Sequence, residues 1–413
     1  MPVLNTSSAS APQPSMNITN PSPWRMWAAA WMVTAVFMLS NSPTPLYGHW
    51  QQQLGFSAGT LTVIFAAYIA GLLATLLVAG QLADRLGRKP ILIPGLFLAI
   101  LACVLFATAS SILMLGIARL LTGVAVGVIV SAGMAVVVDM GGSERKRRAS
   151  LAASVAMVLG AGLGPLLGGT LAQVLQHPVI PIFSTELIVL VSALIVALTL
   201  PSHATSGRAS GSVHPHLKLH LPTVPTANRR HLIFGISIFA PGITATSFVL
   251  SLGPSVLERL LDVRSPLIAG GMACAMFLTA SGVQFIVNRL HIRTIFLLGA
   301  TSTILAMLCL TIAIHASMEV LLIGSALLAG AGQGLGQLGG LTLIATHVPD
   351  NHRAEANAVL NIGGYIPAGL LPVATGYLID AVGLDAGATT FAAVLAIMAA
   401  VGGGLIFKKL HRD

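Results

Sequence analysis

Long apolar stretches alternate with short polar or charged segments along almost the whole chain. Apolar windows broken by Gly, Pro or charge predict membrane-spanning helices, whereas the strand alternation of an outer-membrane barrel is absent. Twelve spans of about 20 residues or more are expected. They lie near residues 25–47, 58–82, 91–110, 112–139, 149–175, 183–201, 231–257, 266–288, 294–315, 317–346, 355–380 and 387–408. The predicted fold class is an all-α polytopic membrane protein with twelve transmembrane helices.

Composition supports the same class. Of 413 residues, 55% are hydrophobic and only 8% are charged, and the mean hydropathy is +0.89. Soluble proteins are about 25% charged, so a soluble enzyme is not expected and neither is a disordered chain. Three cysteines in apolar stretches fit neither a zinc pattern nor a disulfide framework.

The position of the basic residues predicts the orientation of the chain. The net charge is +9, but 21 Lys and Arg spread over the chain make no basic domain, so no nucleic-acid partner is expected. With both termini in the cytoplasm, cytoplasmic segments hold 18 of the 21. Outside loops hold only Arg259 and Arg264, and Arg119 falls within a span. The positive-inside rule therefore places both termini in the cytoplasm.

A long polar segment divides the chain into two halves. We expect a disordered cytoplasmic tail at 1–24 rather than a cleaved signal peptide, and a short cytoplasmic tail at 409–413. Six-helix bundles are expected at 25–201 and 231–408, joined by a central cytoplasmic loop at 202–230. Tryptophans at 24, 27, 31 and 50, with Tyr47, are interpreted as membrane-interface anchors.

The two halves also resemble each other in sequence. With an offset of 207 residues, Gly123 matches Gly330, Pro165 matches Pro372 and Gly169 matches Gly376. With an offset of 204, Asp-Arg-Leu at 84–86 matches Asn-Arg-Leu at 288–290. Two pseudo-symmetric halves around a site near the bilayer midplane are typical of secondary transporters.

The most specific motif connects the second and third spans. Residues 80–89 read Gly-Gln-Leu-Ala-Asp-Arg-Leu-Gly-Arg-Lys. This resembles the signature of the major facilitator superfamily, Gly-x-x-x-Asp-Arg-x-Gly-Arg-[Lys/Arg]. Gly80 is expected to allow close helix packing and Gly87 a tight turn. The resemblance implies a conformational latch that favours the outward-open state, in which Arg88 links Asp84 to an acid ending the fourth span. Its residues here are Gly80, Asp84, Arg85, Gly87, Arg88 and Asp139.

The fourth span carries a buried base. Arg119, Gly123 and Gly127 share one helical stripe. An arginine inside a membrane costs several kcal/mol, so it is a functional candidate, although an arginine that snorkels to the outer interface is the alternative. The superfamily pattern also has an arginine here, linked to proton coupling or substrate.

The fifth span resembles the antiporter signature of drug:proton antiporters. It carries Gly160, Gly164, Pro165, Gly168 and Gly169, although Leu151 replaces a further Gly of the family pattern. Together with Gly123 and Gly127, these small residues are expected to serve helix packing, with the fifth span packed against the eleventh. A generic small-residue interface is the alternative.

The proton carrier is harder to assign. Many proton-coupled multidrug antiporters have an acid in the first span, but this chain has Ser40, Asn41 and Ser42 before Pro43-Thr44-Pro45. Glu186, in the sixth span, is the one acid placed inside a span, at a depth similar to that of Arg119. It is either a coupling residue, paired with Arg119 or protonated, or an interfacial glutamate that reaches headgroup water.

Polar residues on the pathway-lining spans are substrate-binding candidates, with hydrogen bonding between helices as the alternative for each. They are Asn41, Ser131, Thr244, Ser247, Ser251, Gln333, Gln337, Asn361 and Tyr365. Gly-Leu-Gly-Gln-Leu-Gly at 334–339 lies in an apolar helix without a preceding strand, so no nucleotide site is expected. Neither a Walker motif nor repeated metal-ligand spacing occurs, so no cofactor, metal or ATP is expected.

The resemblance implies a transporter of the twelve-span drug:proton antiporter type. A small molecule and protons would be its partners, and a bacterial inner membrane its location, with a monomer expected. Export of an apolar or amphiphilic compound is favoured. A proton symporter or facilitator that imports a metabolite or siderophore is the alternative, and a non-transporting sensor or scaffold is a remote one.

Overall fold

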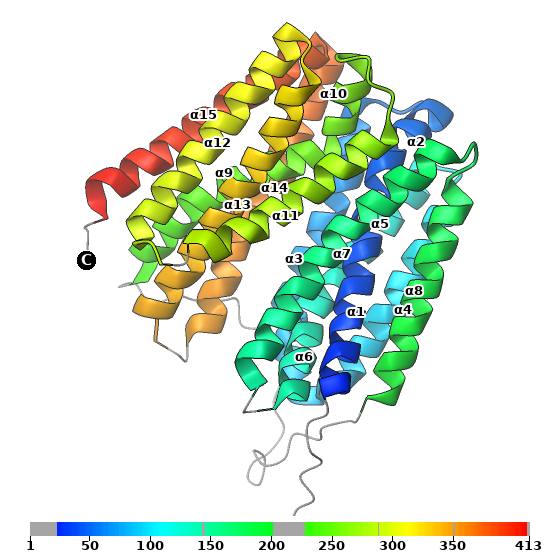
Figure 1. Ribbon diagram of the computed structural model, residues 1–413, viewed down its shortest axis with the longest axis vertical. Helices are drawn as coiled ribbons and strands as arrows, with labels where there is room; N and C mark the ends of the chain where they lie inside the picture. The colour runs from blue at the N-terminus through cyan, green and yellow to red at the C-terminus, as the bar shows by residue number, and fades with distance from the viewer. Residues whose placement is uncertain (1–22, 143–144, 201–227, 288, 350–351, 411–413) are drawn as a thin grey trace, which may run out of the picture.

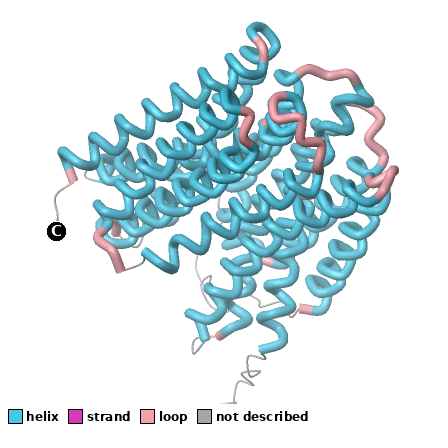
Figure 2. The backbone as a smooth tube through the Cα atoms, turned by 45° about the horizontal axis from the view of Figure 1, so that its top comes forward, coloured by secondary structure: helices cyan, strands magenta, loops and turns pink. Residues whose placement is uncertain are grey.

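The computed structural model describes residues 23–142, 145–200, 228–287, 289–349 and 352–410, apart from the side chains of Pro23, Asp84 and Arg85. These residues form helices and connecting loops without a strand (Figure 2). Eleven of the described helices are long and apolar enough to cross a membrane. The 19-residue α1 packs among them as the twelfth, so the predicted all-α fold is confirmed.

The first half contains α1 to α8, which Figure 1 shows in blue to green. Its elements are α1 Pro23–Asn41, η1 Thr44–Leu46, α2 Tyr47–Leu54, α3 Ala58–Leu86, α4 Lys89–Ala107, α5 Ile112–Val128, η2 Ile129–Gly133, α6 Met134–Gly141, α7 Lys146–Val174 and α8 Val179–Thr199. The predicted first span therefore ends early, because the prolines at 43 and 45 break it into η1 and the short α2. The fourth span is α5 and α6 joined by the π turn η2.

The second half repeats this arrangement. Its elements are α9 Arg229–Ser251, α10 Gly253–Arg259, α11 Pro266–Val287, α12 Ile292–Ala316, α13 Glu319–His347, α14 Arg353–Val382 and α15 Leu384–Lys409. The tail predicted at 1–24 and the loop predicted at 202–230 lie almost wholly outside the described residues, although Arg229 and Arg230 already belong to α9.

The sequence repeat corresponds to repeated contacts. Gly123 of α5 lies against the backbone of α3, where an added Cβ would stand 2.0 Å from the Tyr68 carbonyl oxygen. Gly330 of α13, its match at an offset of 207, lies against α11, where a Cβ would stand 2.2 Å from the Met276 carbonyl oxygen. Without a hydrophobic force between helices in lipid, such close backbone approach is a principal source of packing energy.

The motif at 84–89 has a structural counterpart too. Lys89, at the start of α4, donates hydrogen bonds to the carbonyl oxygens of Leu198 and Leu200 at 2.7 and 2.8 Å. Arg293, 204 residues later, donates to the Phe407 carbonyl oxygen near the end of α15 at 2.9 Å. In both halves a base thus satisfies carbonyl groups at a helix C-terminus, where positive charge is favoured.

The two halves meet at one end of the bundle. Here α7 packs against α11 and α14 against α3. Figure 1 shows the halves converging near α2 and α10, whereas the far ends of α13 and α14 stand apart from α3 and α6. We call the converging end the closed end. The opposite end, which carries Arg88, Arg148, Arg293 and Lys409, is called the basic end.

Substitution of Gly334 should test the backbone contacts. In α13 an added Cβ at Gly334 would stand 1.9 Å from the Ala280 carbonyl oxygen, while one at Gly324 would meet nothing within 4 Å. We expect Gly334→Ala to lower the free energy of unfolding by about 1–3 kcal/mol through overpacking. Gly324→Ala on the same helix should be neutral or slightly stabilising. Thermal unfolding of both purified variants in detergent measures the difference, and equal melting temperatures would contradict the close approach.

Candidate functional site

Arg119 lies on α5, about two turns from the closed end, and its side chain is 1% exposed. Its Nε donates a hydrogen bond to the Tyr47 hydroxyl and its Nη1 to the Ser40 carbonyl oxygen. The guanidinium also lies over the rings of Tyr47, Phe65 and Tyr68, at 5.1, 5.4 and 5.8 Å from their centroids. Arg119 is therefore buried in an aromatic cage rather than directed to the membrane interface.

The Arg119 cage contains no carboxylate. Within the described residues, the ion-pair contacts up to 4.0 Å do not include Arg119, and its Nη2 is buried without a hydrogen-bond partner. A buried cation held only by neutral acceptors and aromatic faces is costly. The remaining N–H donor, Nη2, is available to bind a ligand, or another acceptor in a rearranged state of the protein.

Glu186 is the second charged candidate, two turns into α8 and 0% exposed. One carboxyl oxygen accepts a hydrogen bond from the Ser42 hydroxyl, while Oε2 is buried without a partner. The structure therefore places Glu186 inside the bundle rather than in headgroup water. The pairing of Glu186 with Arg119 that the sequence left open is not formed, because Ser42 and Ser40 respectively bind the two side chains.

The end of the first span links both groups. Ser40 and Ser42, two residues apart, contact Arg119 and Glu186, and Tyr47 follows in α2. Sequence reasoning noted Ser40 and Ser42 only as the place of a missing acid, and it interpreted Tyr47 as an interface anchor. That interpretation is wrong for Tyr47 and for Trp50, because each is 1% exposed. The break at Pro43-Thr44-Pro45 was the available signal, since α2 with its buried Tyr47 begins just after it.

The substrate-binding candidates fall into two groups. Thr244, Ser247 and Ser251 of α9 are buried, and the hydroxyls of Thr244 and Ser251 donate to carbonyl oxygens of their own helix at 2.7 Å. For Thr244 and Ser251 this matches the alternative of hydrogen bonding within the bundle, while substrate binding by the three residues stays a prediction. The others are half-buried, apart from Asn41, which is 9% exposed and donates to the Ser40 hydroxyl at 2.9 Å. They are Ser131, Gln333, Gln337, Asn361 and Tyr365.

Two further candidates lie on the second half. The ring of Tyr365, on α14, meets that of Phe239 edge-on at 6.5 Å. Gln333, on α13, has a buried Oε1 without a hydrogen-bond partner. Ser131 lies in the π turn of the fourth span and bonds to the Gly127 carbonyl oxygen at 2.7 Å. Such π turns occur frequently at functional sites.

The latch motif lies at the basic end. Arg88 forms an ion pair with Asp139 of α6, and both side chains are about a third or more exposed. Gly87 adopts a φ of +89°, which favours glycine and lets the chain turn from α3 into α4. The side chains of Asp84 and Arg85 lie outside the described residues. The close packing expected at Gly80 is not present, because an added Cβ there would meet nothing within 4 Å.

The small residues of α7 do pack closely, but not against the expected helix. Gly160, Gly164 and Gly168 lie against the backbone of α1 or the Ser42 carbonyl that follows it. Gly169 lies against Pro266 of α11, and Pro165 against Gly270. The sequence had suggested the span at 355–380, which is α14. That assignment is wrong, because α14 packs instead on α3, α9 and α15.

Hydrogen bonds join the halves at the closed end. Both carboxylate oxygens of Asp380 on α14 accept hydrogen bonds from the first backbone N–H groups of α3, Ala58 and Gly59, each at 2.9 Å. Glu258 accepts a bond from Gln52 at 2.7 Å, and Ser265 donates to Gln173 at 2.8 Å. A carboxylate on a helix N-terminus is favourable, so Asp380 ties the halves together.

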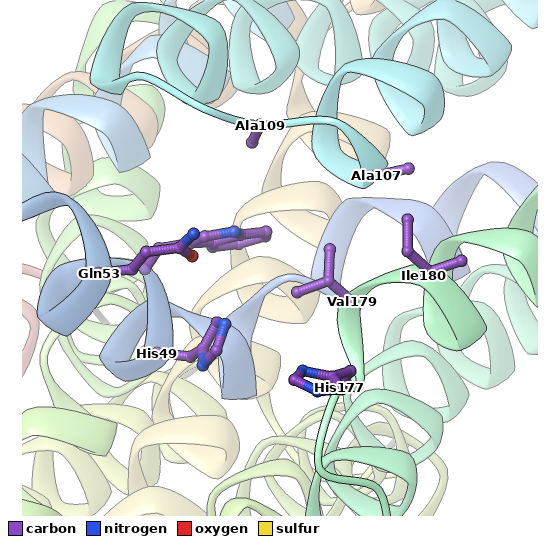
Figure 3. Close-up of a pocket in the computed structure, with 8 residues that line it drawn as sticks. His49, Gln53, Ala107, Ala109, His177, Val179 and Ile180 are labelled. Atoms are coloured by element: carbon purple, nitrogen blue, oxygen red, sulfur yellow. The ribbon is translucent and has the colours of Figure 1, made fainter.

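A separate hollow of about 220 Å³ opens at the closed end of the first half alone (Figure 3). His49 and Gln53 of α2 line one side of it, and His177, Val179 and Ile180 another. Its buried edge is Trp50, whose ring stacks on Phe106 and Phe183 at 5.9 and 6.1 Å. None of the candidate site residues lines this hollow. In the described part of the chain, no group of three metal-ligating side chains forms a metal site.

Two repeated helical halves that meet at one end and diverge at the other are the architecture of many secondary transporters. Sequence comparison is more specific. The family model described as Major Facilitator Superfamily matches residues 27–319 and 232–412, which together cover most of the chain. The chain belongs to this superfamily, whose members are membrane transporters rather than enzymes, and it is an integral membrane protein.

Curated relatives match over shorter stretches. The chain is 38% identical to the multidrug resistance protein MdtL of Shewanella oneidensis over 103 residues, which are 25% of this chain and 26% of that protein. It is 30% identical to MdtL of Escherichia coli over 163 residues, 39% of this chain and 41% of that protein. The alignments therefore span well under half of either relative.

Solved structures match over nearly the whole chain and support the fold alone. The nucleoside transporter NupG superposes with a TM-score of 0.71 at 13% identity, covering 94% of this chain and 100% of NupG. A bacterial homolog of the human lysosomal transporter Spinster, inward-facing and occupied, has a TM-score of 0.70 at 14% identity, with 93% and 96% covered.

Loss of the Asp380 carboxylate should loosen the closed end. In Asp380→Ala both N–H groups at the start of α3 lose their acceptor. A hydrogen bond to a charged group contributes about 1.5–3 kcal/mol to stability, and exposure to solvent reduces this contribution here. The halves should therefore part more often at the closed end in this variant. Spin labels at positions 53 and 264, in a variant without the native cysteines, report the distance between the halves. Asp385→Ala, on the first turn of α15, is the matched control. Identical distance distributions in both variants would show that Asp380 does not hold the halves.

Proposed function

We propose that the protein is a proton-coupled secondary transporter that exports an apolar or amphiphilic small molecule by alternating access. The two halves rock about a site between them, and movement of protons down their gradient resets the cycle. The location proposed is a bacterial inner membrane, with the basic end and both termini in the cytoplasm and a monomer as the working unit. The proposed domain units are the two six-helix bundles at 25–201 and 231–408.

The observation that carries this proposal is the pair of buried, mutually unpaired charged side chains in the first half. Arg119 and Glu186 each keep one buried polar atom without a hydrogen-bond partner. A purely structural ion pair would bring the two together, because each alone in an apolar bundle is destabilising. Groups left in this state are suited to bind a proton or a substrate transiently.

Ser40, Ser42 and Tyr47 supply the connection between the two coupling candidates. Both charged side chains contact the same short segment at the end of α1. We infer that protonation of Glu186 releases Ser42, and that this segment then shifts against Arg119. The half-buried Gln333, Gln337, Asn361 and Tyr365, together with Asn41 and Ser131, would orient the substrate, while apolar walls bind most of its surface.

The arrangement of the halves supports a state closed toward the outside. The hydrogen bonds of Asp380, Glu258 and Ser265 join the halves at the closed end. Under the positive-inside rule that end faces the exterior. The Arg88–Asp139 ion pair would act as a latch at the cytoplasmic rim. Exchange of the partners of this latch would accompany the change of state.

Export is supported by the relatives described as multidrug resistance proteins and by the glycine stripe of α7. Import by symport or facilitated diffusion is the second candidate. The missing acid in the first span favours it, since an exporter of cations would use such an acid. A sensor or scaffold without transport is disfavoured by Arg119 and Glu186, because a rigid scaffold gains nothing from unpaired buried charges.

Substrate-dependent proton movement in inverted membrane vesicles tests the proposal. A panel of compounds is added while a pH-sensitive dye reports an imposed proton gradient. Glu186→Gln keeps the hydrogen bond to Ser42 but cannot exchange a proton, so a compound that dissipates the gradient with the parent should have no effect in this variant. Glu319→Gln, at the exposed start of α13, is the control and should behave as the parent does.

Arg119→Ala in the same assay should abolish substrate-dependent proton movement, because the cage would lose its only cation. Unaltered transport rate and pH dependence in both Glu186→Gln and Arg119→Ala would remove these residues from the coupling mechanism. If no compound moves protons with the parent, uptake into whole cells becomes the test, and accumulation there would favour the importer.

The latch should affect rate more than stability. Asp139→Asn removes the partner of Arg88 at a partly exposed site, where an ion pair contributes under about 1 kcal/mol to stability. We therefore expect an unchanged melting temperature and membrane level but slower substrate flux. Asp84→Asn should act in the same direction. Parent-like flux at equal protein level in both variants would show that this motif is not a latch.

A further inference from the structure

The hollow of about 220 Å³ at the closed end of the first half contains none of the residues proposed for transport. It is lined by α2, the end of α4 and the segment that leads into α8. His49 and Gln53 reach it from α2, where a spacing of four residues puts both on one face of the helix. His177 reaches it from another side, just before α8 begins (Figure 3). Two imidazole rings and an amide group thus meet at the hollow from two separate elements.

Neither imidazole ring is bound to another group of the protein. His49 and His177 are exposed, and among the described residues neither side chain makes a hydrogen bond or an ion pair. His315, an exposed histidine of the second half, differs in this respect, because its Nδ1 lies 2.9 Å from the Thr311 carbonyl oxygen. Rotation of an exposed side chain between staggered rotamers costs little when no bond holds it. The ring nitrogens of His49 and His177 are therefore available to one ligand in the hollow.

The charges around the hollow favour a cation. The segments at 42–57 and 175–178, which supply both histidines, contain no Lys, Arg, Asp or Glu. Arg259 and Arg264 lie on the second half, and neither lines the hollow. Glu258 of α10 lies against α2 and belongs to none of the ion pairs up to 4.0 Å among the described residues. Its negative charge lowers the energy of a cation near α2.

We propose that His49 and His177 bind one divalent transition-metal ion, of the class of Zn²⁺, Ni²⁺ and Cu²⁺, in this hollow. Imidazole nitrogen suits these ions, whereas Ca²⁺ and Mg²⁺ require sets of oxygen ligands that the hollow lacks. The side-chain oxygen of Gln53 and water complete the coordination. Two histidines are fewer than the three or four protein ligands of catalytic and structural zinc sites, so the ion exchanges with solvent. Because its ligands lie far apart in the chain, the site has no ligand spacing that the sequence could show.

An ion in this site would join two elements that carry groups proposed for coupling. The helix α2 begins with Tyr47, whose hydroxyl accepts a hydrogen bond from Arg119, and α8 carries Glu186. A metal bridge from His49 to His177 would therefore limit the movement of α2 relative to α8. This consequence for transport rests on the proposed function. The metal site itself does not, and it can be tested without a substrate.

Quenching of tryptophan fluorescence by Cu²⁺ tests binding on the purified full-length protein without a polyhistidine tag. Trp50 lines the hollow and is the reporter, because a bound Cu²⁺ quenches indole rings close to it. The other three tryptophans lie on the half of α1 nearer the basic end and supply a background that every variant shares. We expect saturable quenching in the parent. The half-saturating Cu²⁺ concentration should rise at least about tenfold in His49→Gln and in His177→Gln, since even the loss of an outer-shell partner costs about 10–100-fold in metal affinity.

His315→Gln is the matched control. His315 is exposed near the end of α12 and does not line the hollow, so this variant should keep the parental quenching curve. The histidines at 203, 214, 216 and 220 remain in every variant, so any metal that they bind is a common background. The melting temperature supplies a second readout that does not depend on Trp50. Zn²⁺ should raise it in the parent and in His315→Gln, but not in the variant that lacks both His49 and His177.

Three results would overturn the proposal. Identical quenching curves for the parent and the two single variants would show that the hollow holds no ion. An equal loss of affinity in His315→Gln would show diffuse binding by exposed histidines. An unchanged melting temperature of the parent at saturating Zn²⁺ would show that no metal bridge joins α2 to the start of α8. None of these results bears on proton-coupled export, which the vesicle assay tests separately.

Discussion

The structure depends above all on the close approach of helix backbones, which a membrane protein needs because lipid gives its helices no hydrophobic reason to associate. This contact is built twice. Inside each half, Gly123 of α5 packs on α3 and Gly330 of α13 packs on α11. Between the halves, Gly169 lies on the start of α11, and Gly376, its match at an offset of 207, lies on the start of α3. Small residues therefore fix helix contacts inside each half. They also make this pair of contacts between the halves, both at the closed end, so that the halves can move as rigid bodies about that end.

A rigid half can hold groups that would otherwise be expelled from an apolar bundle. Arg119 stays in place because the Tyr47 hydroxyl, the Ser40 carbonyl and three aromatic faces surround it. Glu186 stays because Ser42 donates to it. None of these partners carries an opposite charge, so neither group is compensated by an ion pair within the described residues. Ser40 and Ser42 at the end of the first span, and Tyr47 just after its break at the prolines, supply three of these neutral partners.

The sequence predicted the features that depend on local pattern. Apolar periodicity predicted the helices, and the offsets of 204 and 207 predicted two similar halves, in which Lys89 and Arg293 satisfy helix ends in the same way. The family and the fold class are confirmed. Contacts between distant helices could not be predicted in this way. A glycine stripe shows that some helix approaches closely but not which one, so α7 was assigned the wrong partner and Gly80 a contact that it does not make. Hydroxyl groups are similarly ambiguous, because Thr244 and Ser251 can bond to their own helix as well as to a ligand.

The character of the joint between the halves suits a protein that must change state. The packing of α7 on α11 and of α14 on α3 is extensive, but the polar contacts that lock it are few and lie near solvent. Asp380 binds two backbone N–H groups that water can also satisfy once the helices part, so breaking the contact leaves no buried orphan group. Buried ion pairs at the same place would make separation much more costly, because each partner would then lose its counter-charge. The strong electrostatic groups, Arg119 and Glu186, lie instead within one half, so their contacts with Ser40, Ser42 and Tyr47 do not cross the joint.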